Sequence, residues 1–255
     1  MSTVACQFST LLLKWAGAKK LTTVWWRETL GPVWLAAGLK ATTMFLDIKG
    51  GFDNVDHMTL KDRLESRNAP SYMVKWIANF ISYRQCAMVF LGSPRKMVKV
   101  HTGMPQGSPL SPILFVIYVE PLHECPNPTN MFISSFVDDI QVTLSSSSWI
   151  RNTVLLEGAY TRIRDIANSL KLRFSTDKTD LMHWRIPRDR SVICEHPIKV
   201  DEECIQPTPK SVKWLGFHFE LNLSTRTHFT KRLSLAQTAF DTIKRLSTPG
   251  GKLSA

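Results

Sequence analysis

Two adjacent aspartates between two mainly apolar runs constrain this chain more than any other feature. Residues 131–137 and 140–144 have the composition of β-strands, and only Asp138-Asp139 lies between them. A two-residue connection between such runs predicts a tight antiparallel hairpin. The like charges at its tip repel each other, and such turns prefer Asp-Gly or Asn-Gly. The tip is either a solvated turn, which the pair alone favours, or a site where a divalent cation neutralises both carboxylates.

A third acid supports the cation site. Asp47 ends a short run, Met44-Phe45-Leu46, that has the character of a buried strand. Three carboxylates at the ends of adjacent strands could hold two Mg²⁺ ions about 4 Å apart, which suits in-line phosphoryl transfer. The Gly- and Pro-rich loop at 103–109 would let backbone approach a flat ligand closely, and Gln106 offers an amide at its centre.

The remaining pattern predicts an α+β fold, in which an antiparallel sheet is backed by helices on one face. Expected helices start at Asp56 and at Ser71, the second with one apolar stripe (Met73, Val74, Ile77, Phe80 and Ile81), and others span 111–120, 163–170 and 227–246. Expected strands span 86–91 and 96–101, joined by a turn at 92–95, and also 181–184 and 212–219.

Composition narrows the partners. The chain has 255 residues, of which 44% are hydrophobic and 21% charged, and this excludes a disordered or collagen-like chain. The formal net charge of +11 favours a polyanionic partner, nucleic acid before an anionic membrane, although an ordinary basic surface fits it equally well. Five scattered cysteines without a CxxC pair indicate reduced thiols. We therefore expect an intracellular protein, nuclear or cytoplasmic and not secreted, with no membrane span.

Five segments together resemble the reverse transcriptases of non-LTR (LINE-type) retrotransposons. The resemblance lies in the family's motif order A to E, at residues 45–53 (FLDIKGGFD), 103–112 (GMPQGSPLSP), 136–139 (FVDD), 174–180 and 213–216 (KWLG). No single motif is specific, but the five in this order are. The resemblance implies a right-hand polymerase palm and an RNA-directed DNA polymerase that uses two Mg²⁺ ions, with Mn²⁺ as an alternative. Its partners would be an RNA template, a DNA primer and dNTPs, and no specific protein partner follows from it.

The same resemblance implies roles at the metal centre. Asp47 and Asp138 would be the principal ligands of both ions, Asp139 would assist, and the Ile48 carbonyl would complete a shell. Lys178 would give a proton or positive charge to the leaving pyrophosphate, although a solvated lysine is an equal alternative.

Further roles concern the nucleotide and the primer. Phe52 would be the steric gate that excludes a ribose 2′-hydroxyl, against the alternative of a core aromatic. Gln106 and Gly107 would line the incoming nucleotide and the template base, against the alternative that Gln106 is a surface residue of the loop. The primer end would be held by Trp214, Leu215 and Gly216. The histidines fit no ligand spacing and are expected to be structural.

The resemblance also divides the chain. Residues 1–40, rich in tryptophan, are poorly specified and match no fingers motif; residues 41–190 would form the palm with motifs A to D. Residues 191–255 would hold the primer-grip region and the start of a thumb, so fingers and thumb are expected to be incomplete. Gly51 stands where alanine is commoner in the family. The leading hypothesis is a polymerase domain fragment of doubtful activity on its own, and the alternatives are a catalytically dead remnant and a non-catalytic nucleic-acid-binding module.

Overall fold

The computed structural model describes residues 38–87, 89–90, 93–94, 97–125, 130–185 and 196–247. Its helices are α4 (His57–Ser66), α5 (Ser71–Ile81), α6 (Leu110–Val119), α7 (Trp149–Ser169) and α8 (Arg226–Ser247), with 3₁₀ turns η1 (Glu120–Leu122) and η2 (Thr176–Lys178). Its strands are β1 (Lys40–Asp47), β2 (Arg84–Cys86), β3 (Val89–Phe90), β4 (Ser93–Pro94), β5 (Val98–Val100), β6 (Met131–Phe136), β7 (Asp139–Ser146), β8 (Asp180–Trp184), β9 (Ile198–Val200), β10 (Glu203–Ile205), β11 (Ser211–Trp214) and β12 (Phe217–Glu220).

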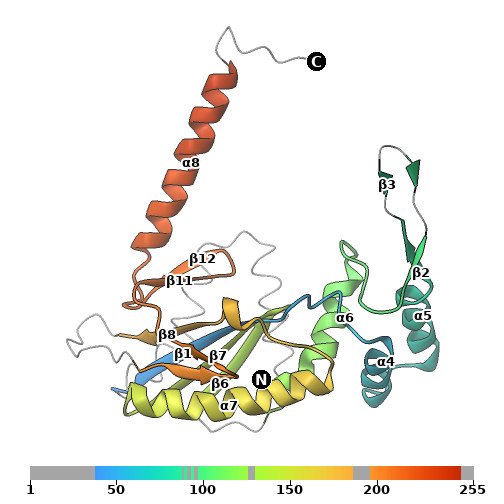
Figure 1. Cartoon of the computed structure of the whole chain (residues 1–255), viewed down its shortest axis with the longest axis horizontal. Helices are drawn as coiled ribbons and strands as arrows, with labels where there is room; N and C mark the ends of the chain where they lie inside the picture. Colours follow the sequence, from blue (N-terminus) through green and yellow to red (C-terminus); the bar gives the residue numbers. More distant parts are fainter. Residues whose placement is uncertain are drawn as a thin grey trace.

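A four-stranded sheet in the order β6-β7-β1-β8 forms the centre of the molecule (Figure 1). All its pairings are antiparallel, and β1 lies between β7 and β8. The β1–β7 register places Asp47 opposite Asp139. This arrangement confirms the predicted α+β fold with an antiparallel sheet.

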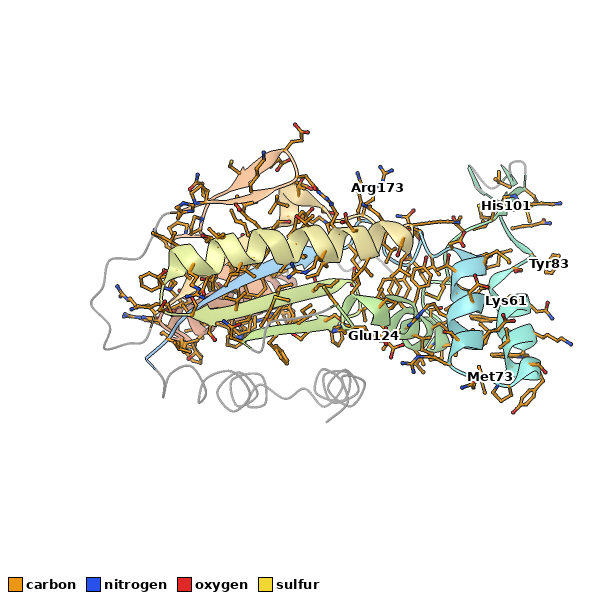
Figure 2. All side chains as sticks on the ribbon, turned by 90° about the horizontal axis from the view of Figure 1, so that it is seen from below. Lys61, Met73, Tyr83, His101, Glu124 and Arg173 are labelled. Atoms are coloured by element: carbon orange, nitrogen blue, oxygen red, sulfur yellow. The ribbon has the colours of Figure 1, made fainter. Side chains whose placement is uncertain are left out.

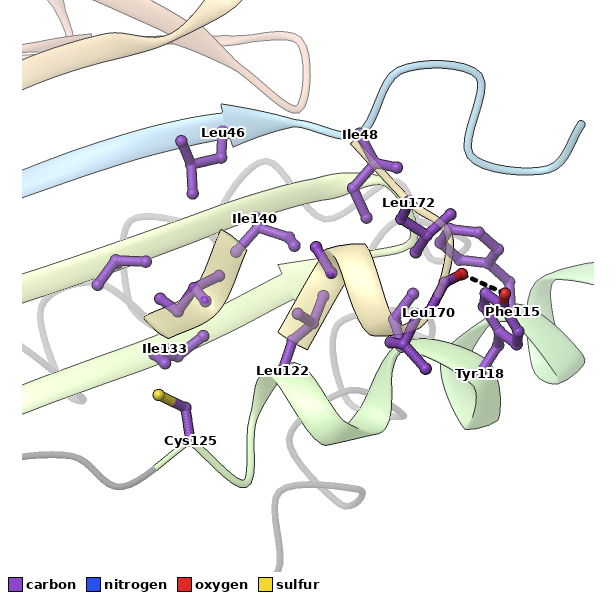
Figure 3. Packing of buried hydrophobic residues seen from close by; sticks show 14 of the residues in the cluster. Leu46, Ile48, Phe115, Tyr118, Leu122, Cys125, Ile133, Ile140, Leu170 and Leu172 are labelled. Carbon is purple, nitrogen blue, oxygen red and sulfur yellow. Dashed lines mark hydrogen bonds between the residues drawn. The ribbon is translucent and has the colours of Figure 1, made fainter. Parts of the chain in front are cut away.

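One face of the sheet packs against α6 and α7, and α7 lies along it (Figure 2). Side chains alternate along a strand, so Met44, Leu46 and Ile48 all point to this face. Figure 3 shows Leu46, Ile48 and Ile140 facing the helical layer. Among the described helices, the two that pack on the sheet, α6 and α7, therefore lie on one face, as the sequence predicts.

The opposite face carries a smaller core beneath the β11–β12 hairpin. Phe45 and Trp184 from the sheet pack with Trp214 and Phe219 from the hairpin. Because Asp47 lies two residues after Phe45 along β1, its side chain is on this same face and not under the helices, and so is that of Asp139 opposite it.

The helices α4 and α5 form a lobe at one end of the sheet (Figure 1). Asp56 caps α4 by accepting from the Thr59 amide at 2.9 Å, as the sequence predicts. The predicted stripe on α5 is only partly correct. Val74, Ile77 and Ile81 are buried, whereas Met73 is exposed on the outer side of the lobe (Figure 2).

Several predicted element boundaries were wrong, because left-handed turn residues and the strand register set them and not the ends of the apolar runs. The turn between β6 and β7 is Val137-Asp138, and Asp139 already pairs with Phe136. The predicted strand at 212–219 is a hairpin with Leu215 and Gly216 in its turn. The hairpin predicted at 86–101 consists of two separate pairs, β2 with β5 and β3 with β4. Strands β9 and β10 were not predicted.

Helix α8 extends away from the rest of the molecule (Figure 1). It begins one residue before the predicted start. Its apolar side chains face solvent, and Phe229, Leu233 and Phe240 are each at least 60% exposed.

The cysteines and the helices bear on two of the expectations from the sequence. The cysteines in the described ranges, Cys86, Cys125 and Cys204, are free thiols. None of the helices described here is long and apolar enough to cross a bilayer. Cys6, Cys194 and the tryptophans before residue 38 lie outside the described residues.

Candidate active site

The two sequence-predicted acidic strand ends meet at one edge of the sheet. Asp47 ends β1 opposite Asp139, and the Ile48 amide donates to the Asp138 carbonyl at 3.1 Å. Val137 has a φ of 58°, so the tight turn uses a left-handed residue before Asp138. This geometry places Asp138 beyond the pairing, where its side chain turns into the adjoining pocket.

A pocket of about 670 Å³ opens beside these carboxylates, within the size range of small-molecule sites. It brings together seven of the predicted site residues: Asp47, Ile48, Phe52, Gln106, Gly107, Asp138 and Lys178. Asp139 does not line it, and neither does the predicted primer-grip segment 214–216.

Asp47 is held by two donors on one oxygen. Its Oδ2 accepts from Lys178 Nζ at 3.1 Å and from Ser175 Oγ at 3.0 Å. The hydrogen bond to Asp47 and then its charge raise the pKa of the exposed Lys178 ammonium. The Ser175 amide also donates to the Asp47 carbonyl at 2.9 Å. Ser175 was missed by the sequence analysis, because a serine in a loop carries no signal of its partner.

The β9–β10 hairpin braces the segment that carries Lys178. Thr176 Oγ1 donates to Glu203 Oε1 at 2.9 Å. Asp201, in the turn of the hairpin, accepts from Tyr160 on α7 at 2.6 Å and pairs with Arg164 at 2.8 Å. Burial and then the hydrogen bond to Asp201 raise the pKa of Tyr160. The position of η2 is thus fixed by contacts from α7 through the hairpin.

The predicted gate, Phe52, is partly buried and packs on Phe115 of α6, with ring centroids 5.0 Å apart. The close fit depends on Gly51. A Cβ there would lie 2.9 Å from Phe115 Cζ and 3.3 Å from Asp138 Cβ. Gly51 therefore leaves the room that the Phe115 ring occupies beside Phe52.

The glycine- and proline-rich loop lies directly on the turn that carries Phe52. The Met104 amide donates to the Phe52 carbonyl at 2.8 Å, and the Gly103 amide donates to the Val55 carbonyl at 2.7 Å. Gly103 has a φ of 78°, and a Cβ there would be 2.8 Å from the Phe52 and Asp53 carbonyl oxygens. Only glycine allows this approach.

Side chains complete the attachment of the loop. The Gly103 carbonyl accepts from His57 Nε2 at 2.9 Å and from Arg84 at 2.6 Å. His57 thus has a structural role, as predicted. Gln106 Nε2 donates to Asp53 Oδ1 at 2.9 Å, a contact that the motif comparison did not predict.

The predicted primer-grip residues lie on the β11–β12 hairpin instead of the pocket wall. Trp214 is buried against Phe45, with ring centroids 5.8 Å apart. Leu215 and Gly216 have φ values of 50° and 74° and form the turn, whose Gly216 carbonyl accepts from Arg232 of α8 at 2.8 Å. The structure therefore joins the hairpin to α8 and leaves its role toward a primer as a prediction.

The residues present fit a divalent cation at Asp47. Asp47 Oδ2 already binds one cation, the Lys178 ammonium. Asp138 supplies further carboxylate oxygens in the same pocket. Within the described residues no three His, Cys, Asp or Glu side chains are grouped closely enough to enclose a metal. Mg²⁺ commonly takes only one or two carboxylates and completes its shell with water and substrate phosphates.

A four-stranded antiparallel sheet backed by α6 and α7, with two carboxylates at a hairpin edge beside a pocket, defines a polymerase palm. The model of the family "Reverse transcriptase (RNA-dependent DNA polymerase)" matches residues 27–219, which is more than half of the chain. This chain belongs to the reverse transcriptase family, and its described part is a reverse transcriptase domain.

Similarity to known proteins agrees with this assignment. The chain is 24% identical over 193 residues to a probable RNA-directed DNA polymerase from the transposon X-element of Drosophila melanogaster. The match covers 74% of this chain and 20% of that protein, so the chain spans about a fifth of its relative's length. The finding confirms the resemblance to reverse transcriptases of LINE-type retrotransposons.

Solved structures show the same fold. Telomerase from Candida albicans, in complex with a fragment of telomeric RNA, superposes with a TM-score of 0.55 at 14% identity, covering 80% of this chain and 32% of that one. A truncated apo telomerase from Candida tropicalis gives a TM-score of 0.53 at 12% identity, covering 87% and 45%. At these identities the likeness confirms the polymerase palm and nothing finer.

Proposed function

We propose that this chain carries out RNA-directed DNA synthesis, in which a primer 3′-hydroxyl attacks the α-phosphate of a dNTP and pyrophosphate leaves. The observation that carries this proposal is the pocket, whose lining brings together the side chains of Asp47, Phe52, Gln106, Asp138 and Lys178. An RNA template, a DNA primer and dNTPs are the corresponding partners. The proposed palm covers residues 41–190, with the primer-grip region and the start of a thumb in 191–255.

The carboxylates of the pocket would hold the metal ions. Asp47 and Asp138, helped by Asp139 and the Ile48 carbonyl, would hold two Mg²⁺ or Mn²⁺ ions. Bound there, such ions lower the pKa of the attacking hydroxyl and neutralise charge on the leaving group. Lys178 releases Asp47 when the triphosphate enters. It then gives a proton or its positive charge to the leaving pyrophosphate.

A second group of lining residues would select the nucleotide. Phe52, supported by Phe115, occupies the space that a ribose 2′-hydroxyl would need. Gln106 and Gly107 line the base. Trp214, Leu215 and Gly216 would hold the primer end, since their hairpin lies on the same face of the sheet as Asp47.

Primer extension tests the proposal. On poly(rA)/oligo(dT) with Mg²⁺, the wild-type chain should incorporate dTTP, and Asp138→Asn should reduce the rate at least about 100-fold because it removes a metal ligand. Asp62→Asn is the matched control, because Asp62 is an exposed acid of α4 outside the pocket. Folded wild-type protein that incorporates nothing would overturn the proposal for this chain.

A non-catalytic nucleic-acid-binding module is the second candidate, because α8 exposes a basic surface. Arg226, Lys231, Arg232, Lys244 and Arg245 are exposed along it, with Asp241 as its acid. Affinity for an RNA–DNA hybrid that falls steeply with salt, without Mg²⁺-dependent incorporation, would favour this module.

A further inference from the structure

The hydrogen bond between Asp53 and Gln106 joins two motifs at the mouth of the pocket. Gln106 Nε2 donates to Asp53 Oδ1 at 2.9 Å, and the residues are 53 positions apart in the chain. Asp53 directly follows the gate Phe52, and both members of the pair line the pocket. A bond in this place can set the geometry of the nucleotide site.

The chemistry of the pair fixes the orientation of the Gln106 amide. An ionised carboxylate has only acceptors, so it bonds the Nε2 end of the amide and never the Oε1 end. With Nε2 held by Asp53, the carbonyl oxygen of Gln106 is turned away from that carboxylate. A free glutamine side chain has no such preference, because its two ends differ little in shape.

The backbone contacts of the loop do not extend to this side chain. They attach Gly103 and Met104 to the turn that carries Phe52, and Ser111 Oγ donates to the Pro105 carbonyl at 2.7 Å. In the part of the chain that the structure describes, Asp53 is the hydrogen-bond partner of the Gln106 side chain. Asp53 therefore completes an attachment that begins at Gly103.

We propose that Asp53 is a positioning residue of the nucleotide site. It orients the Gln106 amide and ties the loop to the gate, so that the base contact and the sugar gate form one rigid unit. This inference rests on the proposed polymerase function. This role differs from that of a metal ligand, because Asp53 Oδ1 accepts from the Gln106 amide.

Two variants at one position separate the acceptor from the charge. Asp53→Ala removes the acceptor, whereas Asp53→Asn keeps a carbonyl oxygen that can accept from Gln106 Nε2 but removes the charge. Asp53 is exposed, so neither change leaves a buried cavity. Asp53→Ala should raise the KM for dTTP about tenfold with kcat changed less than about threefold, since one hydrogen bond to a charged group is lost. Asp53→Asn should recover part of the KM, because its carbonyl oxygen keeps a bond to Gln106 while its own amide donor no longer excludes the reversed orientation.

A double-mutant cycle tests the route. In a Gln106→Ala background, Asp53→Ala should have no further effect on KM, because its partner is already absent. If the two substitutions instead raise KM by the product of their separate effects, the proposal is overturned. An Asp53→Asn variant as impaired as Asp53→Ala would also overturn it. A raised Mg²⁺ requirement in Asp53→Ala would also overturn it, because that result assigns Asp53 to the metal.

Hydrogen exchange separates this inference from the proposed function. Asp53→Ala should speed amide exchange in the 103–109 loop at least about threefold, and Asp53→Asn and the Asp62→Asn control should not. If the wild-type chain incorporates no nucleotide but Asp53→Ala loosens the loop, polymerase activity fails and the attachment stands. If exchange in the loop is unchanged, the attachment fails whatever the activity.

Discussion

The body around the sheet and the helix α8 differ in how they are held in place. In the body, sheet, loop and helices fix one another through buried contacts, and the loop carrying Gln106 is attached to the turn that carries Phe52 by backbone and side-chain bonds. Helix α8 instead exposes Phe229, Leu233 and Phe240 and contacts the body near β12. The comparison teaches that the pocket's geometry is set within the body, and that α8 contributes surface but little core.

The largest expected effect is a loss of stability of the body in acid. His183 is buried and His123 is partly buried, and burial is the main cause that lowers the pKa of each to about 4. Because the unfolded chain binds these protons near pH 6.5 and the folded chain does not, stability is complete above that pH and is lost as pH falls toward 4. Between pH 7 and 5 the two together should cost about 3 kcal/mol of unfolding free energy, measured by urea titration.

Substitution identifies the source of this acid sensitivity. His123→Gln should remove about half of the pH dependence, while His101→Gln, at an exposed position, should leave it intact. Equal stability of the wild-type chain at pH 7 and pH 5 would contradict the account.

The next largest effect on stability is expected where the 103–109 loop is attached to the turn that carries Phe52. Gly103→Ala adds a Cβ 2.8 Å from two carbonyl oxygens at a φ of 78°, and should cost about 2–3 kcal/mol in thermal or urea unfolding. Gly107→Ala is the matched control, since it has a φ of 85° but nothing within 4 Å of the new Cβ. It should cost about 1 kcal/mol from the backbone alone. Equal losses in the two variants would show that the close approach at Gly103 is unimportant.

Gly51→Ala should disturb the gate at a smaller cost. The new Cβ would meet Phe115 Cζ at 2.9 Å, so the ring must move away from Phe52, at about 1–2 kcal/mol of stability. Discrimination between dTTP and UTP in primer extension should fall with it. Adding Phe115→Leu should relieve the contact, and a gate that is equally selective in Gly51→Ala would exclude Phe115 as its support.

The smallest effect is expected on α8. Leu233→Ala and Phe240→Ala should each change the unfolding free energy by less than about 0.5 kcal/mol, because both side chains are exposed. Leu156→Ala on α7, fully buried, should cost about 3 kcal/mol in the same urea titration. A large loss from the α8 variants would show that this helix is part of the folded core after all.

Local patterns in the sequence predicted the elements of the body well. Asp56 capped its helix, and the apolar runs on both sides of Asp138 paired as a hairpin. Boundaries failed where backbone handedness decides, because left-handed residues such as Val137 and Leu215 carry no signal that periodicity detects. The strand predicted through Leu215 consequently became a turn.

Only the site residues that belong to motifs could be predicted from the sequence. The motifs named five residues that line one pocket in the structure: Asp47, Phe52, Gln106, Asp138 and Lys178. The contacts that position them could not be predicted, because they join positions far apart in the chain. The Ser175 hydroxyl reaches Asp47 across 128 positions, and its type alone predicts no partner.

Paramagnetic broadening by Mn²⁺ tests the central claim, that the edge of the sheet at Asp47 and Asp138 is a metal centre, without requiring activity. In isotope-labelled protein, substoichiometric Mn²⁺ should broaden the amide resonances of Asp47, Ile48 and Asp138 first. Asp47→Asn should abolish this broadening and the Asp62→Asn control should preserve it. Broadening that begins elsewhere, or that survives Asp47→Asn unchanged, would contradict the assignment of the pocket as a two-metal polymerase site.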